Sequence, residues 1–375
     1  MTSGISQANR TSDNWTRKEL FCRASESVCL FSPVFVLNIS KPITEWLTTK
    51  VSLGATDEDL AGDDPDTEFN NYDIDNQTQN VTGTLELTPS WDGVFLLGYS
   101  YENRKSDNRN NFDATRDVSS LFANKQLKLA QDIVISAGLR YDNDSDFGEE
   151  TTFRTTFAYV LANTETRFHA SYGTGFKAPS FNELFFPNFG NPNLEAETSW
   201  SYDIGIEQPI FDGSLVLDVT FFQNKIDDLI TFDTTTFLAA NTEEAKIHGI
   251  ETSLDFVVSN SLRGNINYSY TDAENESTDL QLARRPKHRA NISLSASPVG
   301  AFDIYATLLL VNDRIDSDDS RMDNYERVDI AVSYKVCENL KPFFRIDNVF
   351  DQDYEEVNGF ETSDFAVYGG LEVSL

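Results

Sequence analysis

The chain has 375 residues, of which 61 are acidic and 29 are basic, so its formal net charge is −32. This charge excludes a nucleic-acid-binding protein, because such a protein needs a basic surface. The sequence contains no apolar run near the ~18 residues that a membrane-spanning helix requires, and its length suits one large domain or two ordinary ones.

Residues 1–44 differ in character from the rest of the chain. They are irregular and rich in Ser and Thr, and their apolar run Val28–Leu37 is interrupted by Ser32 and Pro33. A secretory signal needs a basic start, an apolar centre and a small-residue cleavage site, and this stretch fits that pattern poorly. We expect 1–44 to be an irregular segment outside the native fold, and 45–375 to form one domain.

From Trp46 onward, apolar and polar residues alternate with a period of two. In Leu262–Tyr270, residues 262, 264, 266, 268 and 270 are apolar, aromatic or glycine, and those between them are polar. Successive strand side chains point to opposite faces, so this pattern predicts a strand with one apolar and one polar face. Similar strands are expected near residues 47–53, 81–87, 95–101, 114–128, 133–141, 150–161, 164–174, 202–206, 215–221, 250–256, 262–270, 292–294, 302–308, 328–334, 344–346 and 365–373.

The connections between these strands alternate strictly in length. Short turns, such as 89–93 and 259–261, are followed by long polar segments at about 56–77, 103–113, 142–149, 175–196, 225–245, 272–286, 312–322 and 349–362. Outer-membrane barrels have short periplasmic turns and longer outer loops, with lipid outside and a polar interior. The sequence therefore predicts an all-β fold, an antiparallel transmembrane β-barrel with about 16 strands present.

Several motifs, in this order along the chain, resemble those of TonB-dependent outer-membrane receptors. They are Tyr172–Leu184, Gly190–Glu197, Asn224–Ile230, Ala245–Glu251, Arg284–His288, and the closing stretch Asn348–Tyr354 with Gly359 and Phe360. Each motif alone is weak, but together they span most of residues 46–375. The sequence of Gly190–Leu194 most resembles the cobalamin-receptor branch of this family. Two departures are Leu375 in place of a terminal aromatic residue, and Thr362–Asp364 where the family often has Pro-Gly-Arg.

The resemblance implies a bacterial outer-membrane receptor for a large, scarce metal chelate such as cobalamin or a ferric siderophore. Complete receptors have a plug domain and a 22-stranded barrel, and the plug carries the segment that recruits TonB. We expect the plug and that segment to be absent here, so that the chain is incomplete and does not drive active transport alone. The expected partners are then the lipid bilayer, lipopolysaccharide and the metal-chelate ligand, and no enzymatic activity is expected.

Two groups of side chains are candidate ligand contacts. Phe181, Phe185, Phe186 and Phe189 lie in a loop stiffened by prolines, where they either stack against a large planar ligand or pack the loop on itself. Arg284 and Arg285 belong to a basic cluster that either binds an anionic group or is a solvated strand entrance.

The segment 56–77 is unusually acidic and is the candidate metal site. Its carboxylates include Asp57, Asp59, Asp63, Asp64 and Asp66. Calcium takes six to eight oxygen ligands, which such a segment supplies. Some cobalamin receptors order outer loops with calcium, so the resemblance supports this site. The alternative is a solvated run of charge. No other cofactor is expected.

Two further function classes compete with the receptor. A soluble or secreted β-rich binding module would explain the acidic composition, but it does not explain the sorted loop lengths. An outer-membrane lipase would need a Ser/His pair on one wall near the rim, and the sequence offers none.

Overall fold

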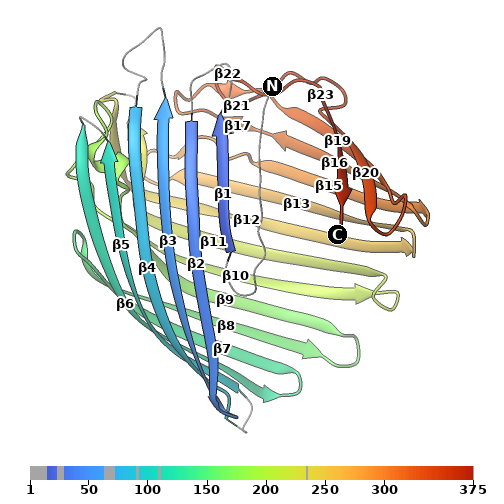
Figure 1. Cartoon of the computed structure of the whole chain (residues 1–375), viewed down its shortest axis with the longest axis horizontal. Coiled ribbons are helices and arrows are strands. Elements are labelled where there is room, and N and C mark those ends of the chain that lie inside the picture. The colour runs from blue at the N-terminus through green and yellow to red at the C-terminus, as the bar shows by residue number, and fades with distance from the viewer. Residues whose placement is uncertain are drawn as a thin grey trace. The chain divides into compact units, whose positions relative to one another are not determined.

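The structure, a computed structural model, describes residues 15–22, 29–62, 72–89, 93–108, 111–233 and 235–374. Within these ranges the regular structure consists of β-strands and one short helix, α1 (Phe181–Phe185) (Figure 1). No helix in this part of the chain is long and apolar enough to cross a membrane. The predicted all-β class is therefore confirmed.

The longer strands alternate with short turns and with loops. They are β1 (Trp15–Cys22), β2 (Cys29–Thr44), β3 (Leu47–Gly62), β4 (Tyr72–Leu87), β5 (Gly93–Asn108), β6 (Phe112–Ala130), β7 (Ile133–Asp144), β8 (Gly148–Leu161), β9 (Thr166–Lys177), β10 (Glu197–Ile210), β11 (Leu215–Asp233), β12 (Leu238–Ser259), β13 (Leu262–Asn275), β15 (His288–Val299), β16 (Phe302–Asn312), β19 (Tyr325–Tyr334), β20 (Leu340–Asp347) and β23 (Ala366–Val373). Short strands lie in the loops: β14 (Leu280–Gln281), β17 (Arg314–Ile315), β18 (Arg321–Met322), β21 (Glu355–Val357) and β22 (Phe360–Glu361). In the described residues from 47 onward, sixteen strands have eight or more residues, as predicted.

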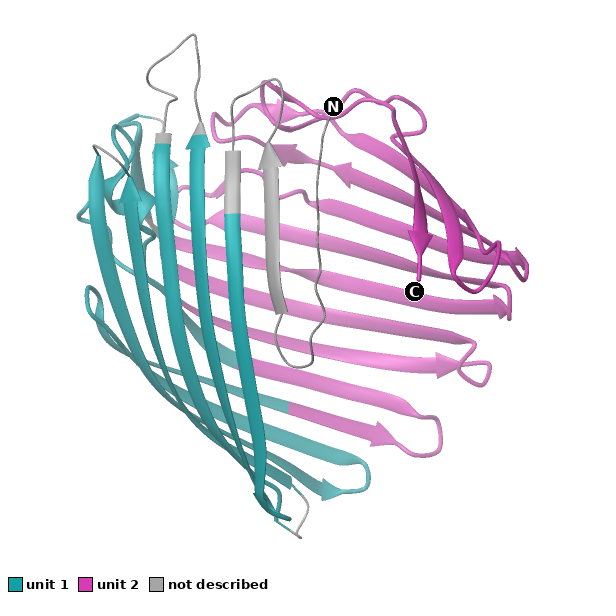
Figure 2. Cartoon of the chain, in the orientation of Figure 1, with its two compact units in different colours: residues 1–156, 173–198, 230–241 teal, residues 157–172, 199–229, 242–375 magenta. Residues whose placement is uncertain are grey.

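The chain divides into two compact units, which Figure 2 colours separately. Unit 1 contains residues 1–156, 173–198 and 230–241, and unit 2 contains residues 157–172, 199–229 and 242–375.

In unit 1, strands β2 to β7 pair antiparallel in chain order. Residues that face one another across these strands form rows, two of which matter below. The Leu85 row contains Thr49, Leu85, Leu97, Ala123 and Leu139. The Gly83 row, the next one towards the loops that follow β3, β5 and β7, contains Val51, Gly83, Tyr99, Leu121 and Tyr141.

These rows lie on the apolar face of unit 1, and the intervening residues form its polar face. On the polar face Arg140 donates to Asp142 (Nε–Oδ1 2.9 Å) and to Ser120 (Nη2–Oγ 2.7 Å). On the apolar face the side chains are widely exposed, and Leu121 is 58% exposed. Soluble monomers rarely expose such a large contiguous apolar surface. The two-faced strands predicted from the alternation are thus present in unit 1.

Unit 2 shows the same division between faces along β12, β13, β15, β16 and β19. Ile266 of β13 faces Leu254 and Ile292 on the two neighbouring strands. On the opposite face Asn265 donates to Asp255 (Nδ2–Oδ1 2.7 Å). The interpretation of Leu262–Tyr270 as a strand with one apolar and one polar face is therefore confirmed.

The structure differs from the expected irregular segment over residues 29–44, because these form β2, which pairs with β3. Two prolines, Pro33 and Pro42, interrupt the alternation of β2, yet they lie within its pairing, opposite Lys18 of β1 and Thr48 of β3. Residues 1–14 and 23–28 lie outside the described part of the chain.

The prediction of loops at 56–77, 103–113 and 225–245 is also wrong over part of each range, where the chain forms strands. Strands β3 and β4 extend to Gly62 and from Tyr72, and β5 and β6 are separated only by residues 109–111. Backbone pairing continues there although the alternation has ended, since a strand beyond the lipid needs no apolar face.

Candidate functional site

The loop between β9 and β10 carries α1 and is the most structured connection of unit 1. Ser180 caps α1: its hydroxyl accepts from the Glu183 amide, and the Glu183 carboxylate accepts from the Ser180 amide. This reciprocal capping box satisfies two amides that the first helical turn leaves free. It fixes a helix that would be too short to form alone.

A small apolar core holds this loop in place. Leu184 and Leu194, each 5% exposed, pack with the fully buried Ala239. Phe189 also packs against this core and stacks on Phe232, with ring centroids 6.0 Å apart.

Arg116 of β6 links this loop to the β7–β8 turn. Its side chain is 3% exposed, donates to the Pro179 carbonyl (Nη1–O 2.7 Å) and forms an ion pair with Asp146 (Nε–Oδ2 3.0 Å). The guanidinium also lies over the rings of Phe147 and Phe181, 5.0 and 5.1 Å from their centroids. Stacking of this kind is a property of Arg that Lys does not share.

Asp144, 3.8 Å from the Arg116 Nε and 5% exposed, completes this arrangement. Its Oδ1 accepts from the amides of Asp146 and Phe147 at 2.8 and 3.2 Å. We call Arg116, Asp144, Asp146, Phe147 and Phe181 the Arg116 cluster. It combines charge, hydrogen bonding and ring contacts in a buried position, which makes it the strongest restraint on the α1 loop.

Polar contacts extend this assembly to the β11–β12 connection. Glu197 accepts from Lys177 (Oε1–Nζ 2.9 Å) and from the Ile230 amide (3.0 Å). Asn191 donates to the Ala239 carbonyl at 3.0 Å, and Asn241 accepts from the Glu195 amide at 2.9 Å. The outer connections of unit 1 therefore form one cross-linked platform.

The four phenylalanines predicted as ligand contacts have different environments. Phe181 lies under Arg116, and Phe189 packs into the core, so both hold the loop. Phe185 is 40% exposed, although its ring lies 5.8 Å from that of Phe112. Phe186 is half-buried. Of the four, Phe185 is the one that offers most surface to a ligand.

The basic cluster of unit 2 is largely neutralised by carboxylates. Arg284 pairs with Asp316 (Nε–Oδ1 2.7 Å), and Lys287 pairs with Asp272 (3.2 Å). Burial alone would raise the pKa of Asp316, but the amides of Asn358 and Ser317 and the Arg284 guanidinium outweigh it and lower the pKa to about 2. Arg285 is exposed and makes no ion pair with another described residue.

A polar cavity of 520 Å³ lies beside this cluster and was not predicted. Its lining combines Arg314, Tyr354 and Asn358 with five carboxylates, Asp323, Asp353, Glu355, Glu361 and Asp364. Arg314 is 5% exposed, donates to backbone carbonyls of residues 323, 355 and 356, and lies 5.0 Å over the Tyr325 ring. Tyr354 belongs to the closing motif Asn348–Tyr354 identified in the sequence. No sequence pattern around Arg314 or Tyr325 predicts that these two residues take part in a site.

The candidate calcium ligands are only partly described. Asp57 and Asp59 lie on β3, and Asp59 faces Asp75 of β4. Asp75 faces Asp107, and Asp107 faces Asp113, so four carboxylates form one row across β3 to β6. Asp63, Asp64 and Asp66 lie outside the described residues. In the ranges the structure covers, no three His, Cys, Asp or Glu side chains are grouped so that they could hold a metal ion.

Comparison with known families and sequences gives consistent results. Residues 37–349 match the family model described as "TonB dependent receptor-like, beta-barrel". The vitamin B12 transporter BtuB of Vibrio vulnificus is 34% identical over 228 residues, 60% of this chain and 36% of that protein. The BtuB of Photobacterium profundum is 31% identical over 264 residues, 68% of this chain and 42% of that protein. The chain thus spans about two fifths of the length of these curated relatives.

Two solved structures with the same fold are those of a copper transporter and a ferric enterobactin receptor. The copper transporter OprC has a TM-score of 0.82 at 15% identity, covering 99% of this chain and 70% of its own. A mutant of the ferric enterobactin receptor PfeA from Pseudomonas aeruginosa has a TM-score of 0.78 at 16% identity, covering 97% and 68%. At these identities the likeness concerns the fold alone.

Proposed function

The chain belongs to the TonB-dependent receptor β-barrel family of the Gram-negative outer membrane, and from this premise we propose that it serves the uptake of cobalamin. The predicted family, fold class and location are thereby confirmed, and the alternative of a soluble binding module is excluded. The relatives named above are transporters and receptors rather than enzymes.

The observation that supports cobalamin is the sequence similarity to two vitamin B12 transporters, at 34% and 31% identity. The siderophore and copper proteins share the fold at much lower identity, so they support the fold alone and do not bear on the ligand. In the proposed process the outer loops bind the ligand, and the TonB system of the complete receptor supplies the energy for its passage.

We assign the first ligand contact to the platform of unit 1. Phe185 presents an aromatic ring on a loop that is fixed by the capping box and the Arg116 cluster. A preorganised ring binds a large planar ligand without the entropic cost of ordering the loop. Aromatic stacking contributes about 0.5–1.5 kcal/mol beyond the buried area.

The test is equilibrium binding of cyanocobalamin to the purified chain in detergent, with ferric enterobactin and Cu²⁺ as competitors. We expect cyanocobalamin to bind and the competitors not to displace it. Phe185→Ala should weaken binding about 2- to 10-fold, the loss expected from one stacked ring. Phe211→Ala is the matched control, because Phe211 is 77% exposed in the turn between β10 and β11.

Preferential binding of ferric enterobactin would contradict the assignment to cobalamin. Equal effects of the Phe185 and Phe211 substitutions would contradict the role of the platform.

Calcium binding by the acidic segment stays a proposal. The support is the row of facing aspartates at the end of β3 to β6 that leads into the segment. Calcium should slow proteolysis between residues 57 and 75, and EDTA should reverse this, while Asp57→Asn together with Asp59→Asn should reduce the protection. Proteolysis that is insensitive to calcium would remove the proposal.

A further inference from the structure

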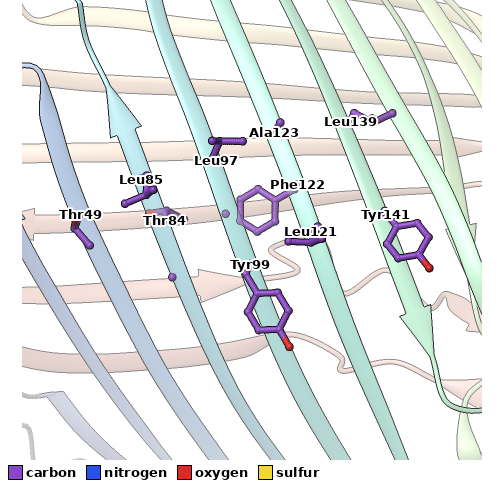
Figure 3. Close-up of a pocket in the computed structure, with 12 residues that line it drawn as sticks. Thr49, Thr84, Leu85, Leu97, Tyr99, Leu121, Phe122, Ala123, Leu139 and Tyr141 are labelled. Atoms are coloured by element: carbon purple, nitrogen blue, oxygen red, sulfur yellow. The ribbon is translucent and has the colours of Figure 1, made fainter.

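Two hollows of the structure differ in character. Figure 3 shows the first, a groove of 650 Å³ on the apolar face of unit 1, where the Leu85 row and the Gly83 row supply leucine and tyrosine side chains. The second is the polar cavity of 520 Å³ in the loops of unit 2. A surface of hydrocarbon faces lipid in outer-membrane barrels, whereas a polar cavity of this size can enclose a small water-soluble molecule.

Two hairpins form the walls of the polar cavity. One is β17 with β18, in the connection between β16 and β19, and the other is β21 with β22, in the connection between β20 and β23. The Arg314 guanidinium on the first hairpin donates to the backbone carbonyls of Glu355 and Glu356 on the second. The Asn358 amide of the second hairpin donates to the Asp316 carboxylate of the first at 2.5 Å. A cavity between cross-linked hairpins is preformed, so a ligand does not have to order it.

The polar cavity contains more negative charge than the structure neutralises. Four carboxylates of its lining make no hydrogen bond or ion pair with another described residue, namely those of Asp323, Asp353, Glu361 and Asp364. The carboxylate of Glu355 accepts only from the Gly359 amide, at 2.9 Å. The two arginines of the lining are engaged elsewhere, because Arg321 pairs with Asp313 and Arg314 donates to backbone carbonyls. Negative charges that face one cavity attract a cation.

The arrangement of these carboxylates fits an organic cation better than a metal ion. A metal ion needs several oxygen ligands directed at one point. Among the residues that the structure describes, no three carboxylates converge in this way. The carboxylates are instead distributed around a cavity of 520 Å³, which is far larger than an ion. This distribution fits a molecule whose positive charges are several ångströms apart, such as one with two ammonium groups.

The remaining lining residues indicate that the molecule also carries hydroxyl groups. The Arg314 side chain is 5% exposed, and its Nε has no acceptor among the described residues. A buried donor without an acceptor is destabilising, and because Arg314 lines the cavity, an oxygen of a bound ligand can supply that acceptor. Asn358 and Thr362 add neutral polar groups, and Tyr354 and Met322 add apolar surface. A sugar ring combines hydroxyl groups with apolar C–H faces and matches this lining.

We propose that the polar cavity binds an amino sugar that carries two or more ammonium groups. The ammonium groups pair with the free carboxylates through charge-assisted hydrogen bonds. A hydroxyl oxygen accepts from the Arg314 Nε, and the apolar face of a sugar ring packs on Tyr354. The site uses residues of unit 2 and none of the proposed cobalamin contact, so either proposal can fail without the other.

Isothermal titration calorimetry of the full chain in a mild detergent tests the proposal. The probe is chitosan disaccharide at about pH 6, where its two amines are protonated and the carboxylates of the cavity are ionised. Its N-acetylated form keeps the ring hydroxyl groups, loses both charges and should bind about tenfold more weakly or less. Cadaverine, a diamine without hydroxyl groups, should also bind more weakly than the disaccharide. Added salt should weaken binding of the disaccharide, because salt screens its ion pairs.

Substitution of the free carboxylates locates the site. Glu361→Gln together with Asp364→Asn should weaken binding of the disaccharide about tenfold, the effect expected from two partly exposed ion pairs. The matched control is Asp319→Asn together with Glu356→Gln, which removes the same charge from the same two loops at exposed residues outside the lining. This control should bind the disaccharide as the wild type does.

The substituted side chains of both double variants are exposed, so both variants should fold, and circular dichroism checks this. Asp323→Asn, on the other hairpin connection, is a second variant that should also weaken binding. Equal losses in the two double variants, equal or tighter binding of the N-acetylated sugar, of cadaverine or of Ca²⁺, or no binding of the disaccharide by the wild type would each overturn the proposal.

Discussion

Replacing Arg116 by Ala should release the α1 loop while the strands stay folded. The substitution removes the hydrogen bond to Pro179, the ion pair with Asp146 and the contacts with two phenylalanine rings. Breaking a buried ion pair by removing one partner costs about 3–5 kcal/mol. Asp144 keeps two amide donors after the change, so the lower end, about 3 kcal/mol, applies.

Hydrogen exchange of the loop amides measures this release. The Leu184 amide donates to Ser180 and the Asn191 amide donates to Glu183, so both report on loop opening. A loss of about 3 kcal/mol corresponds to roughly a hundredfold faster exchange at these amides. Arg116→Lys should give an intermediate rate, because Lys keeps the charge but neither stacks nor donates from a planar fork.

Arg140→Ala is the control for loss of an arginine on the same polar face. Arg140 pairs with Asp142 at 2.9 Å, but its side chain is 44% exposed, so its ion pair contributes about 1 kcal/mol or less. Exchange of residues 180–194 should barely change in that variant. The reasoning is refuted if Arg116→Ala leaves these amides protected, or if Arg140→Ala exposes them equally.

Two further changes give separate tests. Protonation of Asp316 should weaken the protection of the Asn358 amide: the folded-state pKa of about 2 lies below the ordinary 3.8, so the stabilisation is complete above pH 3.8 and is lost as the pH falls towards 2. Asp316→Asn should abolish this pH dependence, whereas a dependence unchanged in that variant would assign it to another group. Gly249→Ala should destabilise the chain to urea by about 1–3 kcal/mol through overpacking, because its Cβ would lie 1.9 Å from the Tyr270 carbonyl oxygen. Gly83→Ala, with open space, should change little, and equal midpoints for the two variants would contradict the packing argument.

The membrane-facing strands could be predicted from the sequence because lipid imposes a two-residue period on them. Leu262–Tyr270 is a strand as predicted, and its faces separate as the alternation indicates. Prediction from the two-residue period fails where a strand extends beyond the lipid, because lipid imposes no such period there. Residues 56–59 are polar on both faces and were predicted as loop, although they continue β3.

The side-chain environments of the candidate site could be predicted only in part. The loop 175–196 and its phenylalanines were identified, but the two alternatives for them could not be separated. The reason is the distance along the chain: Arg116, which holds Pro179 and lies over Phe181, is 63 residues from Pro179. No local pattern predicts a contact of that separation, so Phe181 and Phe185 look equivalent until the fold is known.

The basic cluster illustrates the same limit for charge, and it bears on the kind of ligand. In the sequence Arg284, Arg285 and Lys287 form a cationic patch, but Asp316 and Asp272 neutralise two of them in the structure. With 61 acidic and 29 basic side chains, a cation in this chain has many carboxylates available. An anionic ligand that used Arg284 would have to displace Asp316, whose pKa of about 2 keeps it charged at neutral pH. Recognition through aromatic surface and neutral hydrogen bonds needs no such displacement. This difference favours a ligand that is recognised by its shape over one that is recognised by its negative charge.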